Sequence, residues 1–422
     1  KPKIRFKGYT DDWEQRKLGD VLVSLQNNTL SRADLSNETG VAKNVHYGDV
    51  LIKFGEVLDV SKELLPMISD KSILIKYKTS FLQNGDVIIA DTAEDTTVGK
   101  CSEIVGLNDE VVLSGLHTIP YRPVEKFAPK YLGYYLNSDA YHNQLIPLMQ
   151  GIKVTSISKS AMQDTDIIYP KSKEEQTEIG NYFDALDHLI TLHQRKCEET
   201  KKLKKYMLQK MFPQNGQTVP EIRFAGFTDA WEQRKLEVFG KATGGTSIES
   251  EFSEDGIYKV ISIGSYSENS VYNDQGIRAI KSDKTSNRVL NQNDLTMILN
   301  DKTTSGNIIG RVLLIEESGI YVYNQRTERI EINLDEYDPV FLYEMLNAPN
   351  IREKIIKQAQ GNTQIYVNWT AISLLEYMIP SKEEQVKIGE YLHSISNLIT
   401  LHQHKYEQLQ SMKKFMLQNM FV

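Results

Sequence analysis

Cysteines are scarce in this sequence of 422 residues, and their scarcity excludes several classes of protein. Cys101 and Cys197 lie too far apart in the chain to form a C-x-x-C metal or redox pair, and two cysteines cannot build a disulfide framework. No stretch approaches the roughly 18 consecutive apolar residues of a membrane-spanning helix. We therefore expect a cytoplasmic protein with no membrane partner.

Motifs for catalysis and for cofactor binding are also lacking. The glycine-containing stretches at residues 99–101 and 240–246 do not match the G-x-x-x-x-G-K-[ST] loop that binds nucleotide phosphates. The eight histidines form no H-E-x-x-H motif and no Cys/His cluster at zinc spacing. We therefore expect a chain that is not an enzyme and that itself binds no metal and no cofactor.

Positive charge is in deficit as well. Lys and Arg number 49 against 56 Asp and Glu, which gives a formal net charge of −7. This is the wrong sign for a protein that holds nucleic acid by bulk electrostatics. Any site for a polyanion must therefore be local, and acidic surface remains for basic partners.

The chain does contain an internal repeat, which decides its architecture. Residues 4–18, IRFKGYTDDWEQRKL, return at residues 222–236 as IRFAGFTDAWEQRKL, with 12 of 15 positions identical. A second pair closes the two halves: SKEEQTEIGNYFDALDHLITLHQ begins at Ser172 and SKEEQVKIGEYLHSISNLITLHQ begins at Ser381. Each half thus begins and ends alike.

The middles of the halves, residues 19–170 and 237–379, have diverged to a sparse common pattern. Both mix short β-branched runs, such as 86–90 and 295–299, with helical stretches at 129–143 and 339–357, which predicts a small α+β domain in each half. Matching ends with different middles favour one frame that presents two different recognition domains.

The closing segments are predicted to be long helices. Their apolar residues recur at alternating steps of four and three, the spacing of a coiled-coil seam. Two copies of one helix pair most simply as an antiparallel coiled coil about a pseudo-two-fold axis, and residues 213–220 are predicted to be the hinge. The seam residues are Ile179, Phe183, Leu186, Ile190, His193, Cys197, Thr200, Lys204, Met207 and Met211, then Ile388, Leu392, Ile395, Ile399, His402, Tyr406, Leu409, Lys413, Met416 and Met420.

Further apolar residues widen each stripe beyond a two-helix seam. Two explanations remain open: a partner protein covers them, or the starting segments of the halves do. They are Tyr182, Leu189, Leu192 and Leu203 in the first helix and Tyr391, Leu398, Leu401, Met412 and Phe415 in the second.

These motifs resemble those of the DNA-specificity (S) subunits of type I restriction–modification enzymes. A W-E-x-x-K-L type signature opens each half, and an S-K-E-E-Q form of the P-x-x-E-Q signature precedes each long helix. The first middle also has G-D-[IV]-[IL] at 85–88 and a T-x-x-G-K type turn at 96–100. The second departs from both, at 293–295 and 304–310. The resemblance covers nearly the whole chain.

The resemblance implies an α+β fold with two globular target-recognition domains, joined by two long helices that form an antiparallel coiled coil in a pseudo-two-fold internal repeat. Residues 1–170 would form the first target-recognition domain and 171–212 the first spacer helix. Residues 213–379 would form the hinge and the second domain, and 380–422 the second spacer helix.

The implied function is non-catalytic recognition of double-stranded DNA in host defence. Each domain would read one half of a bipartite site, while the coiled coil sets the spacer and docks two modification (methyltransferase) subunits. Two restriction (translocase/endonuclease) subunits would complete the complex. S-adenosylmethionine, ATP and Mg are expected on these partner subunits. A helix over 172–211, about 60 Å long, can span half-sites that lie about 34–36 Å apart. The alternative is a coiled-coil scaffold that links two binding domains without DNA.

Base edges are read mainly by Arg, Lys, Asn, Gln, Ser and Thr side chains, assisted by aromatic rings. Loops rich in these residues are predicted to contact DNA, whereas Trp13 and Trp231 are expected to be packing anchors because both halves share them. The predicted DNA-binding residues are Lys43, Asn44, His46, Tyr47, Lys153, Thr155 and Ser156 in the first domain, and Thr246, Ser262, Tyr266, Lys302, Thr303, Thr304, Arg326, Asn362, Gln364 and Tyr366 in the second.

Overall fold

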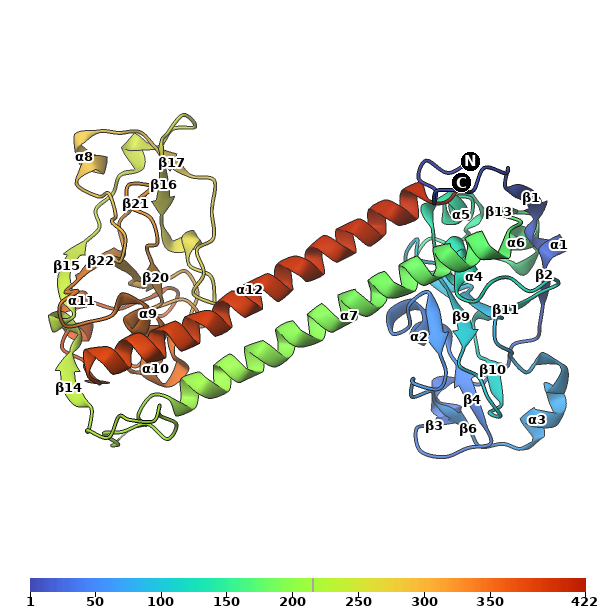
Figure 1. Ribbon diagram of the computed structural model, residues 1–422, viewed down its shortest axis with the longest axis horizontal. Helices are drawn as coiled ribbons and strands as arrows, with labels where there is room; N and C mark the ends of the chain where they lie inside the picture. Colours follow the sequence, from blue (N-terminus) through green and yellow to red (C-terminus); the bar gives the residue numbers. More distant parts are fainter. Residues whose placement is uncertain (215) are drawn as a thin grey trace. The chain divides into compact units, whose positions relative to one another are not determined.

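The computed structural model describes residues 1–214 and 216–422, and its contacts divide the chain into two units. The first unit contains residues 1–194 and 404–422, and the second contains residues 195–403. Two long helices, α7 (Lys173–Lys210) and α12 (Lys382–Asn419), contribute residues to both units (Figure 1). Each unit also combines sheets with short helices, so the predicted α+β class is confirmed.

The first unit is built on a five-stranded sheet of order β2-β11-β7-β9-β5 and a four-stranded sheet of order β10-β4-β6-β3, with the two-stranded pairs β1-β13 and β12-β8. Its strands are β1 (Glu14–Lys17), β2 (Leu22–Ser24), β3 (Leu35–Ser36), β4 (Ala42–Val45), β5 (Val57–Asp59), β6 (Met67–Ile68), β7 (Val87–Ala90), β8 (Thr92–Ala93), β9 (Cys101–Val105), β10 (Val112–Ser114), β11 (Thr118–Pro123), β12 (Thr155–Ser156) and β13 (Asp166–Tyr169). Its short helices are α1 (Leu18–Val21), α2 (Tyr47–Ile52), α3 (Ser72–Lys76), α4 (Tyr131–Leu136), α5 (Asp139–His142) and α6 (Lys159–Gln163).

The second unit has a four-stranded sheet of order β15-β22-β18-β20 and a three-stranded sheet of order β17-β16-β21, with the pairs β14-β24 and β19-β23. Its strands are β14 (Glu232–Lys235), β15 (Gly240–Gly244), β16 (Tyr258–Ile261), β17 (Arg278–Ala279), β18 (Leu295–Ile298), β19 (Asn300–Asp301), β20 (Val312–Leu314), β21 (Tyr321–Tyr323), β22 (Thr327–Ile332), β23 (Ile365–Tyr366) and β24 (Glu376–Ile379). Its short helices are α8 (Asp283–Ser286), α9 (Pro339–Asn347), α10 (Pro349–Ile356) and α11 (Trp369–Ile372).

Both units contain the same four strands in the same order, β2-β11-β7-β9 in the first and β15-β22-β18-β20 in the second. The central strands β7 and β18 are buried along their whole length, because their apolar side chains meet protein on both faces of the sheet. Each unit also pairs two strands in parallel, β4 with β10 and β16 with β21. The halves therefore share one backbone frame.

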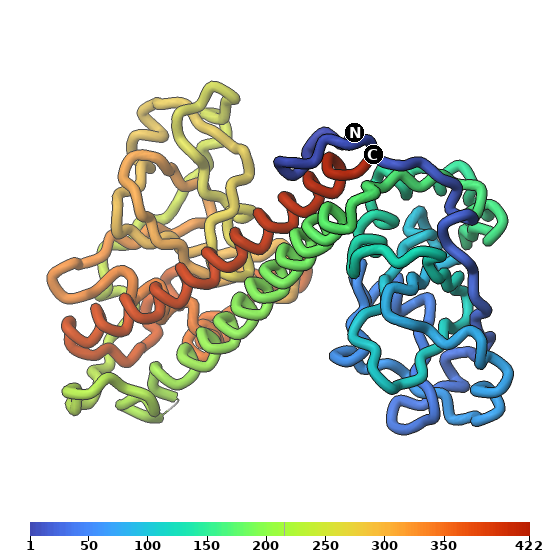
Figure 2. Tube along the Cα trace, turned by 45° about the vertical axis from the view of Figure 1, so that its right-hand side comes forward, coloured from blue at the N-terminus to red at the C-terminus, as the bar shows by residue number. Residues whose placement is uncertain are grey.

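The long helices run antiparallel within the first unit. Asp187 near the start of α7 contacts Lys413 of α12, and Phe183, one turn earlier, stacks on Phe421 with ring centroids 5.7 Å apart. Figure 2 shows the end of α12 beside the start of α7 next to the first domain. Phe421 also contacts the ring of Trp13, so the end of the second half completes the core of the first unit.

The second unit repeats this arrangement with the roles of the helices exchanged. Lys204 near the end of α7 donates to Ser396 of α12 at 2.7 Å, and Phe212 packs against Trp231 and Phe341. All of the predicted seam residues are buried or half-buried. The antiparallel coiled coil and its seam are therefore confirmed within each unit.

Two predicted helical stretches are interrupted. Residues 129–143 divide into α4 and α5, and residues 339–357 divide into α9 and α10. The second break falls at Ala348, whose extended backbone is expected before Pro349 because proline disfavours the helical conformation of the preceding residue. Among the described residues, no helix combines the length and apolarity that crossing a membrane would require.

Candidate nucleic-acid interface

The repeated signatures form the frame that positions the loops of each domain. Arg5 of the opening segment donates to both carboxylate oxygens of Glu175 at 2.6 and 2.9 Å, and Arg223 donates to Glu384 at 2.7 Å in both bonds. The two glutamates are 2% and 0% exposed. Such bidentate pairs fix geometry as well as charge. The second Glu of each E-E-Q signature therefore holds the opening segment of its half against the long helix.

The neighbouring glutamine links the helix to the domain. Gln176 accepts a hydrogen bond from the backbone N–H of Ala128 and donates to the carbonyl of Pro170, at 2.9 and 2.7 Å. In the same way, Gln385 accepts a hydrogen bond from the backbone N–H of Asp338 and donates to the carbonyl of Pro380. The signature is thus structural in both units.

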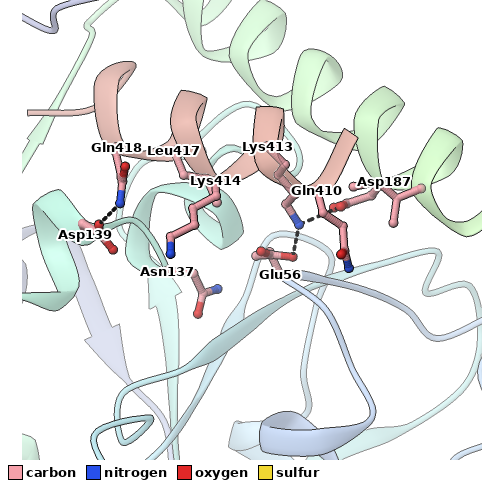
Figure 3. A pocket seen from close by; sticks show the side chains of 10 residues that line it. Glu56, Asn137, Asp139, Asp187, Gln410, Lys413, Lys414, Leu417 and Gln418 are labelled. Carbon is pink, nitrogen blue, oxygen red and sulfur yellow. Dashed lines mark hydrogen bonds and ion pairs between the residues drawn. The ribbon is translucent and has the colours of Figure 1, made fainter. Parts of the chain in front are cut away.

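Equivalent lysines fix the second helix of each pair to the domain. In the first unit, Lys413 lies 2.6 Å from Asp187 and 2.8 Å from Glu56, and Figure 3 shows both contacts converging on its ammonium. Tyr134 donates to Asp187 at 2.7 Å. Burial raises the pKa of Asp187 despite the attraction of Lys413.

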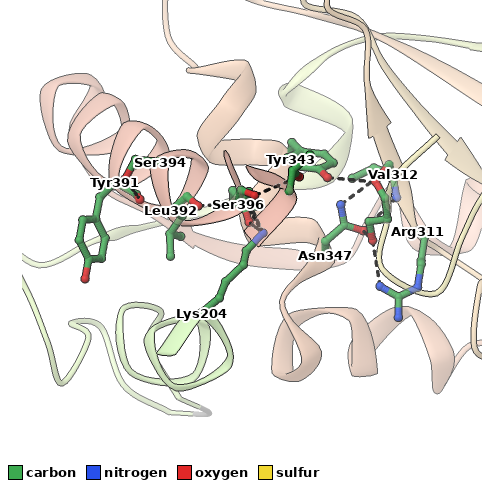
Figure 4. A network of polar contacts seen from close by, with 12 residues as sticks. Lys204, Arg311, Val312, Tyr343, Asn347, Tyr391, Leu392, Ser394 and Ser396 are labelled. Carbon is green, nitrogen blue, oxygen red and sulfur yellow. Dashed lines mark hydrogen bonds and ion pairs between the residues drawn. The ribbon is translucent and has the colours of Figure 1, made fainter. Parts of the chain in front are cut away.

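In the second unit the same role falls to Lys204, which contacts Ser396 (Figure 4) and Glu344 at 2.7 and 2.9 Å. Ser396 stands where the first unit has Asp187, and Glu344 stands where it has Tyr134. The lysine is therefore kept in both units, whereas its carboxylate partner on the long helix, Asp187, is replaced by a serine, and a domain residue, Glu344, supplies the negative charge.

The departure of the second middle from the G-D motif leaves the turn unchanged. Gly85 has φ 89° and Asn293 has φ 71°, and asparagine is among the residues that tolerate this left-handed conformation. Asp86 pairs with Arg122 at 2.7 Å, as Asp294 pairs with Arg329 at 2.8 Å. The two middles thus form the same turn from different sequences.

Four loops converge in the first domain. His46 and Tyr47 follow β4, and the Tyr47 ring lies 5.3 Å from the ring of His117, which precedes β11. The Nδ1 of His117 lies 3.4 Å from Asp91 and from Thr92 at the start of β8. Thr92 in turn pairs with Ser156 of β12. Segments far apart in sequence therefore form one polar surface.

His46 is neutral in its position at the start of α2. Its Nδ1 accepts a hydrogen bond from the backbone N–H of Gly48 at 3.2 Å, which requires an unprotonated nitrogen. Burial lowers the pKa of His46 below its ordinary value, in agreement with this role.

The second domain brings the corresponding loops together. Ser262 follows β16 as His46 follows β4, and Arg326 precedes β22 as His117 precedes β11. Asn300 of β19 pairs with Tyr366 of β23. A hollow of about 340 Å³ lies between the loop after β16 and the loop that contains Lys302 and Thr303.

A hairpin with the same backbone borders each of these surfaces. Gln150 bridges to Ser156 and Gln360 to Tyr366 around a five-residue loop. Gly151 and Gly361 have φ 115° and 105°, and a Cβ at either would lie 2.0 or 2.1 Å from a backbone oxygen across the loop. The tips differ: Ile152, Lys153 and Val154 in the first domain, and Asn362, Thr363 and Gln364 in the second, all exposed.

Two predicted DNA-binding residues are buried, where they cannot contact DNA directly. Asn44 is fully buried, where its carbonyl accepts from Asn28, and Tyr266 is 4% exposed. Lys43, which is half-buried, pairs with Glu110 at 2.8 Å, and Thr246, which is exposed, accepts from Arg288 at 3.0 Å. The prediction is therefore wrong for Asn44 and Tyr266. Asn44 lies on the inward-facing side of a buried strand, and the ring of Tyr266 is buried although it belongs to a loop.

The other predicted residues lie on the converging loops or the hairpins. No sequence motif marked His117, Asp91, Thr92 or the apolar tip residues Ile152 and Val154, which belong to the same surface. An alignment of the turns before β11 and β22, Leu-His-Thr and Gln-Arg-Thr, would have identified His117 as the residue equivalent to Arg326. The remaining predicted residues are His46, Tyr47, Lys153, Thr155, Ser156, Ser262, Lys302, Thr303, Thr304, Arg326, Asn362, Gln364 and Tyr366.

The starting segments of the halves cover only part of the wide apolar stripe on the long helices. Tyr182 and Tyr391 are covered by Phe6 and Phe224 of the opening segments, with ring centroids 5.9 and 5.8 Å apart. Other stripe residues remain between 39% and 55% exposed. These are Leu189, Met412 and Phe415 in the first unit, and Leu203, Leu398 and Leu401 in the second.

A group of three or more His, Cys, Asp or Glu side chains placed to hold a metal ion is not found within residues 1–214 and 216–422. The arrangement instead offers hydrogen-bond donors, acceptors and apolar contacts on two equivalent polar surfaces. Such groups suit recognition of base edges and phosphates.

Comparisons with known proteins agree with the duplicated frame. A family model described as the type I restriction modification DNA specificity domain matches the chain twice, over residues 10–202 and 228–411. The type I restriction enzyme MjaVIII specificity subunit of Methanocaldococcus jannaschii is 26% identical over 273 residues. That match covers 63% of this chain and 63% of the relative, so the chain spans less than two thirds of the relative's length.

Two further proteins match over most of their length. The putative type I restriction enzyme MjaX specificity subunit of the same organism is 22% identical over 420 residues, 96% of this chain and 91% of that protein. The crystal structure of a type I restriction-modification system S subunit from M. genitalium aligns with a TM-score of 0.62 at 13% identity, over 100% of this chain and 99% of that chain, so the two share a fold.

Proposed function

This chain belongs to the type I restriction-modification DNA specificity family, and from that premise we propose that it recognises a bipartite site on double-stranded DNA. Each domain reads one half-site through the loops that converge around His117 or Arg326. The two half-sites differ because the loop residues differ.

One observation supports this proposal above the others: the frame contacts are preserved between the halves while the exposed loop residues are not. The Arg5–Glu175 and Arg223–Glu384 pairs are equivalent. The hairpin tips at 152–154 and 362–364, by contrast, have different chemistry on the same backbone. A scaffold that joined two domains without reading DNA would have no reason to vary these positions selectively.

The exposed apolar stripe on the helices suits protein partners. A contiguous patch of apolar side chains that is exposed to solvent indicates an interaction site. We assign the stripe to two modification (methyltransferase) subunits, one on each unit, and two restriction subunits complete the complex. This chain is then non-catalytic, and S-adenosylmethionine, ATP and Mg bind to the partners. The acidic net charge is tolerable because those partners supply much of the phosphate neutralisation.

The test is a map of methylated adenines in cells that express this chain with its modification subunit, compared with cells that lack this chain. We expect a bipartite motif that depends on the chain. If a stable complex forms and the map does not change, the scaffold alternative is favoured instead.

Domain exchange sharpens the test. Replacing residues 19–170 by the corresponding residues of another specificity subunit should change one half of the motif and preserve the other. A change in both halves would contradict modular recognition. Deleting one heptad from each long helix, at equivalent positions, should change the spacer or abolish assembly, and an unchanged spacer would refute its proposed role as a ruler.

A further inference from the structure

One left-handed backbone position is shared by the two domains and contains neither glycine nor asparagine. His117 has φ 55° and Arg326 has φ 66°. The residues are equivalent: each directly precedes β11 or β22, and each carbonyl accepts a hydrogen bond from the residue after β7 or β18, at 3.1 Å from Asp91 and 2.9 Å from Leu299. Glycine is the default residue here, because a Cβ strains this conformation.

Other left-handed positions of the shared frame follow that rule. There the chain uses glycine or asparagine, which relieves the strain. These pairs are Gly8 with Gly226, Gly85 with Asn293, Gly99 with Gly310, and Gly151 with Gly361. At His117 and Arg326 the chain instead keeps a long polar side chain in both halves. Strain that one substitution could relieve indicates that the side chain itself has a function.

The position of His117 suits contact with a ligand outside the chain. Its side chain is 48% exposed, and its Nδ1 lies beside Asp91 and Thr92. The ring packs edge-on against Tyr47 at 75°. Because Nδ1 faces Asp91 and Thr92, Nε2 on the other side of the imidazole points away from these two residues.

Arg326 occupies the same place in the second domain. The side-chain oxygen of Asn300, in the amide orientation that satisfies both groups, accepts from Nη1 of Arg326 at 2.6 Å. This bond uses one of the five donors of the guanidinium. Asn300 also pairs with Tyr366 at the base of the hairpin, so Asn300 links Arg326 to that hairpin.

We propose that His117 and Arg326 are equivalent base-reading residues, each contacting a base-pair edge in the half-site of its own domain. This inference rests on the proposed function and specifies where it acts. The guanidinium fork of Arg326 matches O6 and N7 of guanine, whereas His117 with a proton on Nε2 can donate to N7 of a purine. The second domain should therefore require guanine at its position, and the first should accept a purine.

The test uses the full chain assembled with its methyltransferase subunits and the variants His117→Gly and Arg326→Gly. Methylation rates are measured on duplexes with every single-base substitution in each half-site, alongside the melting temperature of the complex. The matched control is Asn293→Gly, which changes a left-handed residue at a frame turn. Glycine removes backbone strain, so a purely structural role predicts unchanged recognition.

We expect His117→Gly to lower the methylation rate on the cognate duplex roughly 10- to 100-fold, as loss of one base contact would. It should abolish discrimination at one base pair of one half-site, without lowering the melting temperature. Arg326→Gly should do the same in the other half-site, and Asn293→Gly should do neither. His117→Arg should restore the rate on duplexes with guanine at the affected position.

The inference is overturned if both glycine variants keep the wild-type rate and base preference. It is also overturned if the melting temperature falls and discrimination weakens equally at every position, because that pattern indicates a folding role. A wild-type complex that methylates no bipartite motif would instead contradict the proposed function, and this inference with it.

Discussion

The two hairpins that border the proposed interface have the same backbone and different tips. Gly151 and Gly361 make the same turn, yet one loop presents Ile-Lys-Val and the other Asn-Thr-Gln. The buried Arg–Glu pairs of the frame, by contrast, are identical in residue type and nearly identical in distance. The duplicated chain has therefore kept the residues that hold the loops and changed the residues that the loops expose.

A second comparison concerns residues that keep one function by different means. The start of α4 is capped by Glu103 of β9, which accepts from the backbone N–H groups of Lys130 and Gly133 at 2.6 and 2.9 Å. The start of α9 is capped by its own Asp338, which accepts from Phe341 at 2.7 Å. The orphan N–H groups of a helix must be satisfied, but the fold leaves open which residue does so.

The largest expected effect on stability concerns the equivalent lysines Lys204 and Lys413 and the carboxylates that they contact. Lys204→Ala leaves Glu344, 1% exposed, without its cation and should destabilise the second unit by about 3–5 kcal/mol. Lys413→Ala should cost the first unit less, because Glu56 and Asp187 are 18% and 33% exposed.

Urea denaturation followed by tryptophan fluorescence measures both losses of stability, since Trp13 lies in the first unit and Trp231 lies in the second. Lys204→Met combined with Glu344→Leu should recover most of the stability, because it removes the orphaned charge. Equal losses for the two lysine variants would contradict the role of burial.

Exchanging the hairpin tips should alter recognition without altering the frame. Replacing residues 152–154 by Asn-Thr-Gln should change the first half-site at one or two base pairs, with discrimination of about 1–3 kcal/mol each. The second half-site should stay as it was. Methylated-adenine mapping measures the change, and Gly151→Val, which breaks the turn, provides the contrast in which binding is lost at all sequences.

A smaller effect follows from a carboxyl group that the second domain buries where the first has Ile119. Burial raises the pKa of Glu328 to about 7, against an ordinary 4.5, although Arg288 partly offsets the shift. The folded state therefore binds this proton more tightly than the unfolded chain, and its stability should fall as pH rises from about 4.5 through 7.

Glu328→Gln stays neutral, so we expect it to exceed the wild type by about 1–2 kcal/mol at about pH 8 and to match it near pH 5. Thermal unfolding across this range measures the difference. Glu331→Gln, on the exposed face of the same strand, should leave the profile unaltered. A constant difference between Glu328→Gln and the wild type would show that the carboxyl does not titrate as described.

The smallest effect is expected at the turn where Gly85 and Asn293 are equivalent. Exchanging these residues should change the free energy of unfolding by only about 0.5 kcal/mol, because both accept a left-handed backbone. Gly85→Val should cost about 1–2 kcal/mol or more at the same place. A similar cost for asparagine and valine would show that the turns are not equivalent.

Local patterns predicted much of the fold. The four-three spacing identified the seam of both helices, and the apolar runs identified β7 and β18, because burial of a face leaves a period in the sequence. Residue type alone predicted the interface less well. Asn44 and Tyr266 have the chemistry of base readers, but their side chains point into the core.

The sequence by itself determined that the chain contains two copies of one frame, each built on a pair of antiparallel helices, because the repeated signatures and the seam are properties of neighbouring residues. Only the tertiary structure decided which residues share a surface. His117 meets Tyr47 and Thr92 through a left-handed turn and two strand pairings that bring together segments far apart in the chain. Such contacts leave no period in the sequence, because they depend on how the whole sheet closes around its core.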